Sequence, residues 1–469
     1  MTGEDYYDSK EFRKILSKYE KARNAGEPVF QDADELAEIA DYYRMNGESE
    51  QADIAIKLAL KLSPGAVSPL CYCIHEALDN NDTAKAWHYL NQIIDKDDPD
   101  YVYCRGEILV AEDRIDEAEQ YFNDTLKTVP DDERQDYLLD VVNIYDDGGL
   151  NEKAMEWMMR VTPDGSSDYK EAMARSLFGV GKFKDSARLF NELLDTDPFQ
   201  KRYWNALASA QYMTEDYSGA VESSEYAIAI DPNDPDGLIA KANSLYHLGN
   251  RELAIDYYHR YLDQVPDDEF TMLLLGTCLV DCDRSDEAVD VLKEAVEIGQ
   301  PYSPYLPDIY QELAFAYKER GEIDEAIRCI DMTDAMDCDH IQMTVIKGHI
   351  QLSAEHIKEA EHYFRQALQE SDTPAKTLLR IIVSLYDNLY LEAAYKMMLH
   401  YFKLVEPDDR DGYAYMALCC HDLKRNDEYM QYLEKACQLN PAECKFVLSH
   451  LFPKEVEPKN YYNYLKENS

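Results

Sequence analysis

The stretch Trp204–Pro232, WNALASAQYMTEDYSGAVESSEYAIAIDP, lies near the middle of a chain of 469 residues. Small residues recur in it at Ala208, Ala220 and Ala227, and Pro232 ends it. Apolar residues three and four positions apart are typical of amphipathic helices. Proline cannot donate the helical hydrogen bond, so it stops a helix or restarts one. The stretch therefore predicts two helices packed as a hairpin, with small residues where the two backbones approach closely.

The same spacing recurs along most of the chain. We take Ala220 as the reference position, and its equivalents follow at intervals of 32 to 38 residues, with an interval of 34 in six of eleven cases. The reference residues are Ala52, Ala86, Ala118, Ala154, Ser186, Ala220, Ala254, Ala288, Ala326, Ala360, Ala394 and Tyr429. In most repeats a small residue precedes the reference by twelve positions, and in many a bulky one follows it by four. This correlation predicts an array of helical hairpins whose neighbours bury one another's faces.

The pattern resembles the tetratricopeptide repeat family over about residues 33–443. The residues that match its motif are Trp204, Leu207, Ala208, Ala220, Ala227 and Pro232, with Gln211 where the family usually has tyrosine. The resemblance implies an all-α fold, a right-handed superhelical solenoid of about twelve hairpins with a concave inner groove. It also implies that the groove binds a protein or peptide, and that both ends of the array are capped.

The ends of the chain contain candidate caps. Residues 1–32 are expected to form an N-terminal segment with a capping helix over Ser9–Ala22. The solenoid is expected over residues 33–443, and residues 444–469 should hold a C-terminal capping helix and a tail. That closing helix is predicted over Ala442–Leu451, with Phe446, Val447 and Leu451 on its packing face. The tail after Pro453 is either a further short helix or loosely held.

One connection between repeats is longer than the others. The segment Ile298–Asp308, IGQPYSPYLPD, contains three prolines and produces the interval of 38 residues. Repeat arrays tolerate longer loops between their repeats. The segment is therefore either such a loop or a break in curvature near residues 299–307.

The chain is strongly acidic, with 93 acidic and 47 basic residues and a net charge of −46. This charge disfavours binding to nucleic acids and to anionic membrane surfaces. It serves solubility, or it attracts a basic partner. The segment Asp95–Glu152 has nineteen acidic and five basic residues, a local charge of −14. A basic segment could dock there, although solvated helix faces explain the same composition.

The sequence also suggests where the protein resides. No basic start followed by an apolar run appears at the N-terminus, and no apolar run is long enough to span a bilayer. We therefore expect a cytoplasmic protein whose eleven cysteines are reduced.

Motifs of catalysis are missing from the sequence: it has no glycine-rich phosphate loop, no nucleophile elbow and no CxxC pair. We therefore expect no enzyme activity and no obligatory cofactor. One cluster offers an alternative, because Cys71 and His75 lie four residues apart on a predicted helix and Cys104 should face the same pocket from the next repeat. Two thiols and an imidazole could hold zinc or copper(I) in a metal-dependent regulator or enzyme. They could equally be semi-polar lining residues.

The central repeats place polar and aromatic residues on the expected inner face. The predicted peptide-binding residues are Asn143, Arg175, Arg202, Asn205, Tyr212, Asn243 and Tyr246. Asparagine can bind both the N–H and the C=O of an extended peptide, and tyrosine gives contact area at low entropic cost. The alternative is a solvated inner face. We expect a non-catalytic adaptor or scaffold that binds a protein or peptide in this groove. The alternative structural role is a scaffold that associates with further copies of itself.

Overall fold

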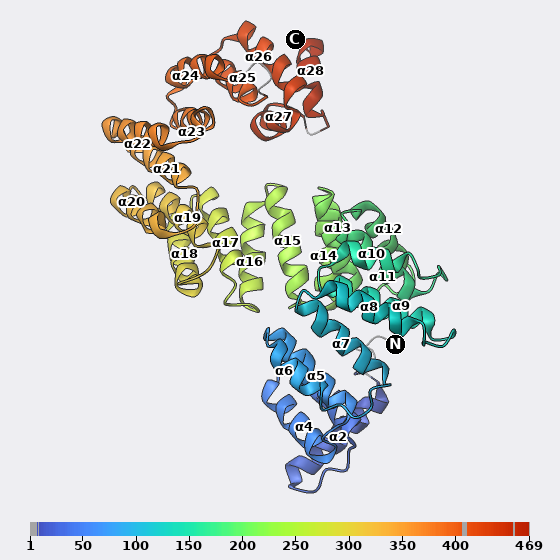
Figure 1. The fold of residues 1–469 in the computed structure, drawn as a ribbon. Helices are drawn as coiled ribbons and strands as arrows, with labels where there is room; N and C mark the ends of the chain where they lie inside the picture. Colours follow the sequence, from blue (N-terminus) through green and yellow to red (C-terminus); the bar gives the residue numbers. More distant parts are fainter. Residues whose placement is uncertain (1–6, 8, 406–409, 454, 469) are drawn as a thin grey trace. The chain divides into compact units, whose positions relative to one another are not determined.

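The computed structural model describes residues 7, 9–405, 410–453 and 455–468. Within these residues the chain forms α-helices joined by short turns, and no β-strand is assigned. The helices divide into two compact units, Met1–Ile230 and Asp231–Ser469, called unit 1 and unit 2 here. Figure 1 gives the order of the helices along the chain.

The described residues of unit 1 from Ser9 onwards form one leading helix and six hairpins. The leading helix is α2, Lys10–Ala25. The hairpins are α3 (Ala33–Met45) with α4 (Ser49–Leu62), α5 (Val67–Asp79) with α6 (Thr83–Leu90), α7 (Pro99–Ala111) with α8 (Ile115–Leu126), α9 (Arg134–Asp147) with α10 (Asn151–Met158), α11 (Ser167–Gly179) with α12 (Phe183–Leu194), and α13 (Lys201–Met213) with α14 (Tyr217–Ile230).

Unit 2 adds six further hairpins and two closing helices. The hairpins are α15 (Pro235–His247) with α16 (Arg251–Leu262), α17 (Glu269–Asp281) with α18 (Ser285–Gly299), α19 (Leu306–Glu319) with α20 (Ile323–Asp331), α21 (His340–Ser353) with α22 (Ile357–Glu370), α23 (Pro374–Asp387) with α24 (Leu391–Leu404), and α25 (Tyr413–Asp422) with α26 (Asn426–Leu439). The closing helices are α27 (Pro441–Leu448) and α28 (Tyr461–Asn468). The predicted all-α array of twelve hairpins is confirmed.

The positions that define the sequence repeat form the contact between the helices of each hairpin. All twelve reference residues are buried, from Ala52 to Tyr429. At the small positions the helices approach so closely that a Cβ on Gly106 would lie 2.1 Å from Cζ of Phe122. A Cβ on Gly276 would lie 2.5 Å from Cδ2 of Leu292. The bulky residue of the second helix therefore fills the space that the small residue of the first helix leaves.

Ser186 is one of the two reference residues that are not alanine. Its hydroxyl is fully buried and donates a hydrogen bond to the Ala174 carbonyl oxygen at 2.8 Å. A buried hydroxyl is tolerated when it finds such a partner. The substitution therefore keeps the close approach of α11 and α12.

A left-handed residue closes every hairpin turn, five positions before the reference residue. Five of these residues are glycines and seven carry a side chain. They are Gly47, Asn81, Asp113, Gly149, Gly181, Glu215, Gly249, Asp283, Gly321, Glu355, Leu389 and Lys424, with φ between 55° and 81°. This conformation reverses the chain after the first helix, and it strains residues other than glycine.

The N-terminal helix that we expected over Ser9–Ala22 is α2. Ser9 caps it, because its hydroxyl accepts a hydrogen bond from the Phe12 amide at 3.1 Å. Phe12 and Tyr19 are fully buried against α3 and its neighbours. The helix continues three residues beyond the expected end and stops at Gly26, which is left-handed.

The C-terminal end differs in one respect from the prediction. Phe446 is 80% exposed, so it does not belong to the packing face of α27. Val447 is buried as expected, together with Cys444 and Leu448, because three- and four-residue spacing puts these residues on one face of the helix. The tail includes the short helix α28, whose Tyr461 stacks on Phe452 with ring centroids 3.9 Å apart.

The long connection with three prolines lies inside unit 2, between α18 and α19. These two helices pack directly against each other across the connection. A break in curvature near residues 299–307 stays a prediction. Among the described residues, no helix combines the length and the apolar character that crossing a membrane requires.

Candidate functional site

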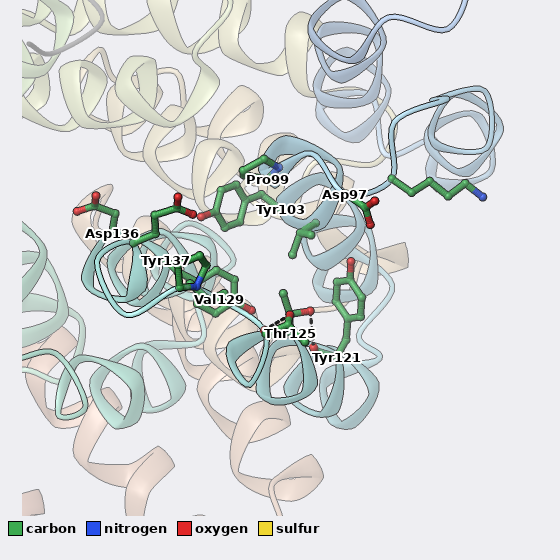
Figure 2. A pocket seen from close by; sticks show the side chains of 13 residues that line it. Asp97, Pro99, Tyr103, Tyr121, Thr125, Val129, Asp136 and Tyr137 are labelled. Carbon is green, nitrogen blue, oxygen red and sulfur yellow. Dashed lines mark hydrogen bonds between the residues drawn. The ribbon is translucent and has the colours of Figure 1, made fainter.

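A pocket of about 530 Å³ opens in unit 1 where α7, α8 and α9 meet. The residues that line it come from the beginning of α7 and the connection before it, from the second half of α8 and the connection after it, and from the beginning of α9. They are Lys96, Asp97, Pro99, Val102, Tyr103, Tyr121, Thr125, Thr128, Val129, Pro130, Glu133, Asp136 and Tyr137. Figure 2 shows Asp136 on one side of the pocket and Asp97 on the other, with the ring of Tyr103 between them and Tyr121 on the side of Asp97.

The three tyrosines are held in place by contacts within their own hairpin or with the neighbouring one. Tyr137 is buried and its hydroxyl donates to the Phe122 carbonyl oxygen at 2.9 Å. Tyr103 lies beside Asp140 on α9, and burial together with this carboxyl group raises the pKa of the Tyr103 hydroxyl. Tyr121 carries the guanidinium of Arg105 over its ring at 4.5 Å. The aromatic part of the pocket is therefore preformed, which lowers the entropic cost of binding.

Carboxylates surround these rings. Asp97, Glu133 and Asp136 are exposed at the edge of the pocket. Asp140 lies next to Tyr103, and burial raises the pKa of its carboxyl group although the Tyr103 hydroxyl lowers it in part. Tyrosine faces and carboxylates together attract cations such as lysine and arginine side chains. We name this site, defined by its lining residues, the acidic tyrosine pocket.

Two predicted groove residues of unit 1, Arg175 and Arg202, form ion pairs between successive hairpins. Arg202 on α13 pairs with Glu171 on α11, with Nη2 and Oε2 2.7 Å apart. Arg175 on α11 likewise pairs with Asp147 on α9. These two arginines thus link neighbouring first helices, and any ligand would have to share or displace those pairs.

The other predicted residues of unit 1 are aromatic or amide side chains. Asn143, Asn205 and Tyr212 are half-buried. Tyr212 packs edge-on against Tyr217, with ring centroids 5.4 Å apart. Next to Asn143, burial raises the pKa of Asp146 to about 6 even though the Ser176 hydroxyl donates to it. This part of α9 and α11 therefore carries carboxylates as well as amides.

Two predicted groove residues, Asn243 and Tyr246, belong to unit 2. The Oδ1 atom of Asn243 accepts a hydrogen bond from the Tyr258 hydroxyl at 2.8 Å, so only part of the amide faces a ligand. Tyr246 has the guanidinium of Arg251 at 5.6 Å from its ring centroid. The binding role of all seven predicted groove residues stays a prediction.

The three predicted metal ligands lie together in unit 1. Sγ of Cys104 is 3.8 Å from Nε2 of His75, and Cys71 belongs to the same buried cluster as Cys104. The neighbouring Cys71 thiol and burial both raise the pKa of Cys104. His75 also contacts Glu107, with Nε2 and Oε2 2.9 Å apart, and this contact raises the pKa of the imidazole.

Two features of these sites escaped the sequence analysis. Glu107 occupies the position in its repeat that His75 occupies in the preceding one, eleven residues before the reference residue, so the spacing contains a signal for it. The acidic tyrosine pocket combines residues from two helices of one hairpin and one of the next. Only the packing angle of these helices reveals that the side chains share a cavity.

Family models match three parts of the chain. A tetratricopeptide repeat model matches residues 74–133 and 171–235, and another matches residues 412–443. The chain belongs to the tetratricopeptide repeat family. A model of subunit 3 of the anaphase-promoting complex, or cyclosome, matches residues 213–295 of this tetratricopeptide repeat protein.

Solved structures show partial likeness to the chain. A tetratricopeptide repeat protein from Parabacteroides merdae ATCC 43184 is 14% identical, with 51% of this chain and 94% of that chain covered and a TM-score of 0.43. YrrB, described as a TPR protein with an unusual peptide-binding site, is 18% identical, with 44% and 97% covered and a TM-score of 0.35. MamA from Desulfovibrio magneticus RS-1 is 17% identical, with 36% and 93% covered and a TM-score of 0.33.

Tetratricopeptide repeats stack into extended surfaces, and this fold suggests a scaffold for protein–protein interaction.

Proposed function

We propose that this protein is a non-catalytic scaffold that binds a basic, extended segment of another protein at the acidic tyrosine pocket of unit 1. The single observation that carries the proposal is the composition of this pocket. Three tyrosines form part of its walls. Three exposed carboxylates, Asp97, Glu133 and Asp136, line it against one cation, Lys96. A lysine or arginine side chain could insert between the rings while its charge stays close to the carboxylates.

The charge of the chain supports a basic partner. The pocket lies within Asp95–Glu152, whose nineteen acidic and five basic residues give −14, and the whole chain has −46. The negative electrostatic potential of such a surface raises the association rate of positively charged segments. This rate falls when salt is added, because salt screens the charges. Electrostatic complementarity of this kind contributes to specificity more than to affinity.

The half-buried amides of unit 1 would extend the binding surface beyond the pocket. Asn143 lies on α9, the helix that also carries Asp136 and Tyr137 of the pocket wall. An asparagine amide can bind the main chain of an extended peptide as donor and acceptor. Asn205 would serve in the same way on α13. Main-chain binding by amides and side-chain binding in the pocket together describe an extended ligand.

The proposal is tested by fluorescence anisotropy with two labelled peptides of equal length, one rich in lysine and one rich in glutamate. The lysine-rich peptide should bind and the glutamate-rich peptide should not. Replacing two pocket acids, Glu133→Gln with Asp136→Asn, should weaken binding about tenfold, because each removed charge pair is partly desolvated by the ligand.

A matched control separates the pocket from the general charge. Asp131→Asn with Asp132→Asn removes the same charge from exposed neighbours that do not line the pocket, and the Asp131 side chain is 99% exposed. This control should bind the lysine-rich peptide with nearly the affinity of the unchanged protein. Equal weakening in both double variants would contradict a role for the pocket, as would equal binding of the two peptides.

A further inference from the structure

Four potential metal ligands lie on two adjacent helices of unit 1. Cys71 and His75 are four residues apart on α5, and Cys104 and Glu107 are three apart on α7. Both spacings place the two side chains on one face of a helix. The helices α5 and α7 are the first helices of successive hairpins and pack against each other. The four side chains therefore face the contact between these two hairpins, and those of His75, Cys104 and Glu107 come together there.

The distances bring the ligand atoms into one coordination sphere. The candidate ligand atoms of His75, Cys104 and Glu107 all lie within 4.8 Å of one another, and in the described part of the chain no other such group occurs. In tetrahedral zinc sites, ligand atoms are roughly 3.4–3.6 Å apart, given Zn–N and Zn–S bonds of about 2.0–2.3 Å. Sγ of Cys104 and Nε2 of His75 are 3.8 Å apart. The His75–Glu107 contact, at 2.9 Å, would have to lengthen when an ion binds.

The two thiols are buried, whereas the imidazole and the carboxylate are partly exposed to solvent. Cys104 is 2% exposed and Cys71 is 6% exposed, so the thiols form the floor. The side chain of Glu107 is 29% exposed and that of His75 46% exposed. An ion can thus enter from solvent past the imidazole and carboxylate and reach the sulfur atoms.

Cys71 belongs to the same buried cluster as Cys104 but lies outside the group whose ligand atoms are within 4.8 Å of one another, so its side chain has to move towards them to supply a fourth ligand. Its Sγ lies 3.9 Å from the Asp100 carbonyl oxygen, one helical turn before Cys104 on α7. Two thiolates, one imidazole and one carboxylate form a mixed sulfur, nitrogen and oxygen set that suits Zn²⁺, whereas copper(I) prefers sulfur alone.

We propose that Cys71, His75, Cys104 and Glu107 bind one Zn²⁺ ion, which links α5 to α7 and so joins the second hairpin to the third. This inference is independent of the proposed function, because the ligands lie outside the acidic tyrosine pocket. The bound ion would stabilise the hairpin contact, since it binds the folded and not the unfolded arrangement.

The test uses the full chain, reduced and stripped of metal, titrated with Co²⁺ as a spectroscopic substitute for zinc. One equivalent should produce thiolate-to-cobalt absorption in the near ultraviolet and the strong visible bands of tetrahedral cobalt. One equivalent of Zn²⁺ should then abolish these bands, and Mg²⁺ should not. Native mass spectrometry should show one zinc ion per chain.

Variants identify the ligands. His75→Ala and Cys104→Ser should each weaken Zn²⁺ binding at least tenfold. Glu107→Gln should weaken it as well, although the glutamine keeps the size of the side chain and removes only its charge. Cys278→Ser is the matched control, because Cys278 is a buried cysteine on α17 of unit 2 with a second cysteine four residues on. Circular dichroism of each variant checks that it is folded.

The outcomes decide the proposal directly. Stoichiometric zinc binding that the His75, Cys104 and Glu107 variants weaken, and that the Cys278 variant retains, would support it. It would be overturned if the unchanged chain bound no zinc, bound only copper(I), or bound zinc equally well in the Glu107→Gln variant.

Discussion

At the scale of single residues, the structure separates side chains that hold the array together from those that a ligand can reach. Arg175 and Arg202 are engaged in ion pairs between hairpins, and Asn243 is engaged by Tyr258. The sequence could place these residues on the first helices, because the repeat spacing fixes the face of a helix. It could not predict their partners, because a hydrogen bond depends on rotamers and on the side chains of the adjacent helix.

His349 on α21 provides a prediction at this scale. Burial and the charge of Lys318 lower the pKa of its imidazole to about 4. In the neutral form, Nδ1 accepts a hydrogen bond from the Asn388 amide, at 3.3 Å. Proton uptake would break this contact and place a second positive charge near Lys318.

The pH dependence follows from the lowered pKa. The unfolded chain binds a proton at His349 near the ordinary value of about 6.5, and the folded chain only near 4. The stabilising contribution is therefore complete above pH 6.5 and is lost as the pH falls towards 4. We expect a loss of about 1–2 kcal/mol in the free energy of unfolding of unit 2, after allowance for partial exposure of the ring.

An NMR titration of the His349 ring protons measures this pKa directly, and His349→Gln should remove the corresponding slope from the unfolding curves. His362→Gln, at an exposed histidine of α22, is the control and should leave the slope unchanged. A measured value near 6.5 for His349 would show that its surroundings do not disfavour the charged form.

At the scale of the elements, the hairpin is specified by a few positions. The small residue, the reference residue and the bulky residue could all be predicted from the sequence, because they recur with one period and the structure buries them. The left-handed turn residue was not recognised as a fixed position, since glycine fills it in only five repeats. The backbone conformation is common to all twelve repeats, whereas the residue type is not.

The turn between α23 and α24 gives a prediction at this scale. Leu389 is left-handed with φ of 65° and is 81% exposed, so its side chain adds strain and little packing. Leu389→Gly should raise the free energy of unfolding by about 0.5–1 kcal/mol, since relief of the strain exceeds the entropy that glycine adds to the unfolded chain. Chemical denaturation of the full chain, with amide hydrogen exchange in α23 and α24, measures the change.

Two companion variants complete this test. Gly249 has φ of 81° with open space around it, so Gly249→Ala should lower the stability by about 1 kcal/mol through backbone strain alone. Leu389→Ala keeps a Cβ in the left-handed conformation and should change little. A lower stability for Leu389→Gly would mean that the leucine side chain contributes packing that outweighs its strain.

At the C-terminal end the sequence predicts the helix and its buried Val447, but not the exposure of Phe446. The structure buries the smaller Cys444 instead. Phe446 directly precedes Val447, so the two side chains lie on different sides of the helix, and hydrophobicity alone does not tell which of them is buried.

At the scale of the whole molecule, the sequence pattern extends evenly through the chain, but the helices form two compact units that divide at residues 230 and 231. The repeat spacing gives no signal there, because the interval between Ala220 and Ala254 is the common one of 34 residues. The irregular connection near residue 303 was the more conspicuous feature of the sequence, and it lies inside unit 2.

The proposed function places binding in one part of this array. Because all residues of the acidic tyrosine pocket lie in unit 1, contacts of the ligand with unit 1 should suffice for binding at the pocket. Loss of the pocket acids should therefore affect binding without changing the stability of unit 2.

Hydrogen–deuterium exchange of the full chain, with and without the lysine-rich peptide, tests the central claim most directly. The account predicts slower exchange in α7, α8 and the first half of α9, with the effect removed by Glu133→Gln and Asp136→Asn. Slower exchange confined to unit 2, or none at peptide concentrations that saturate binding, would contradict it.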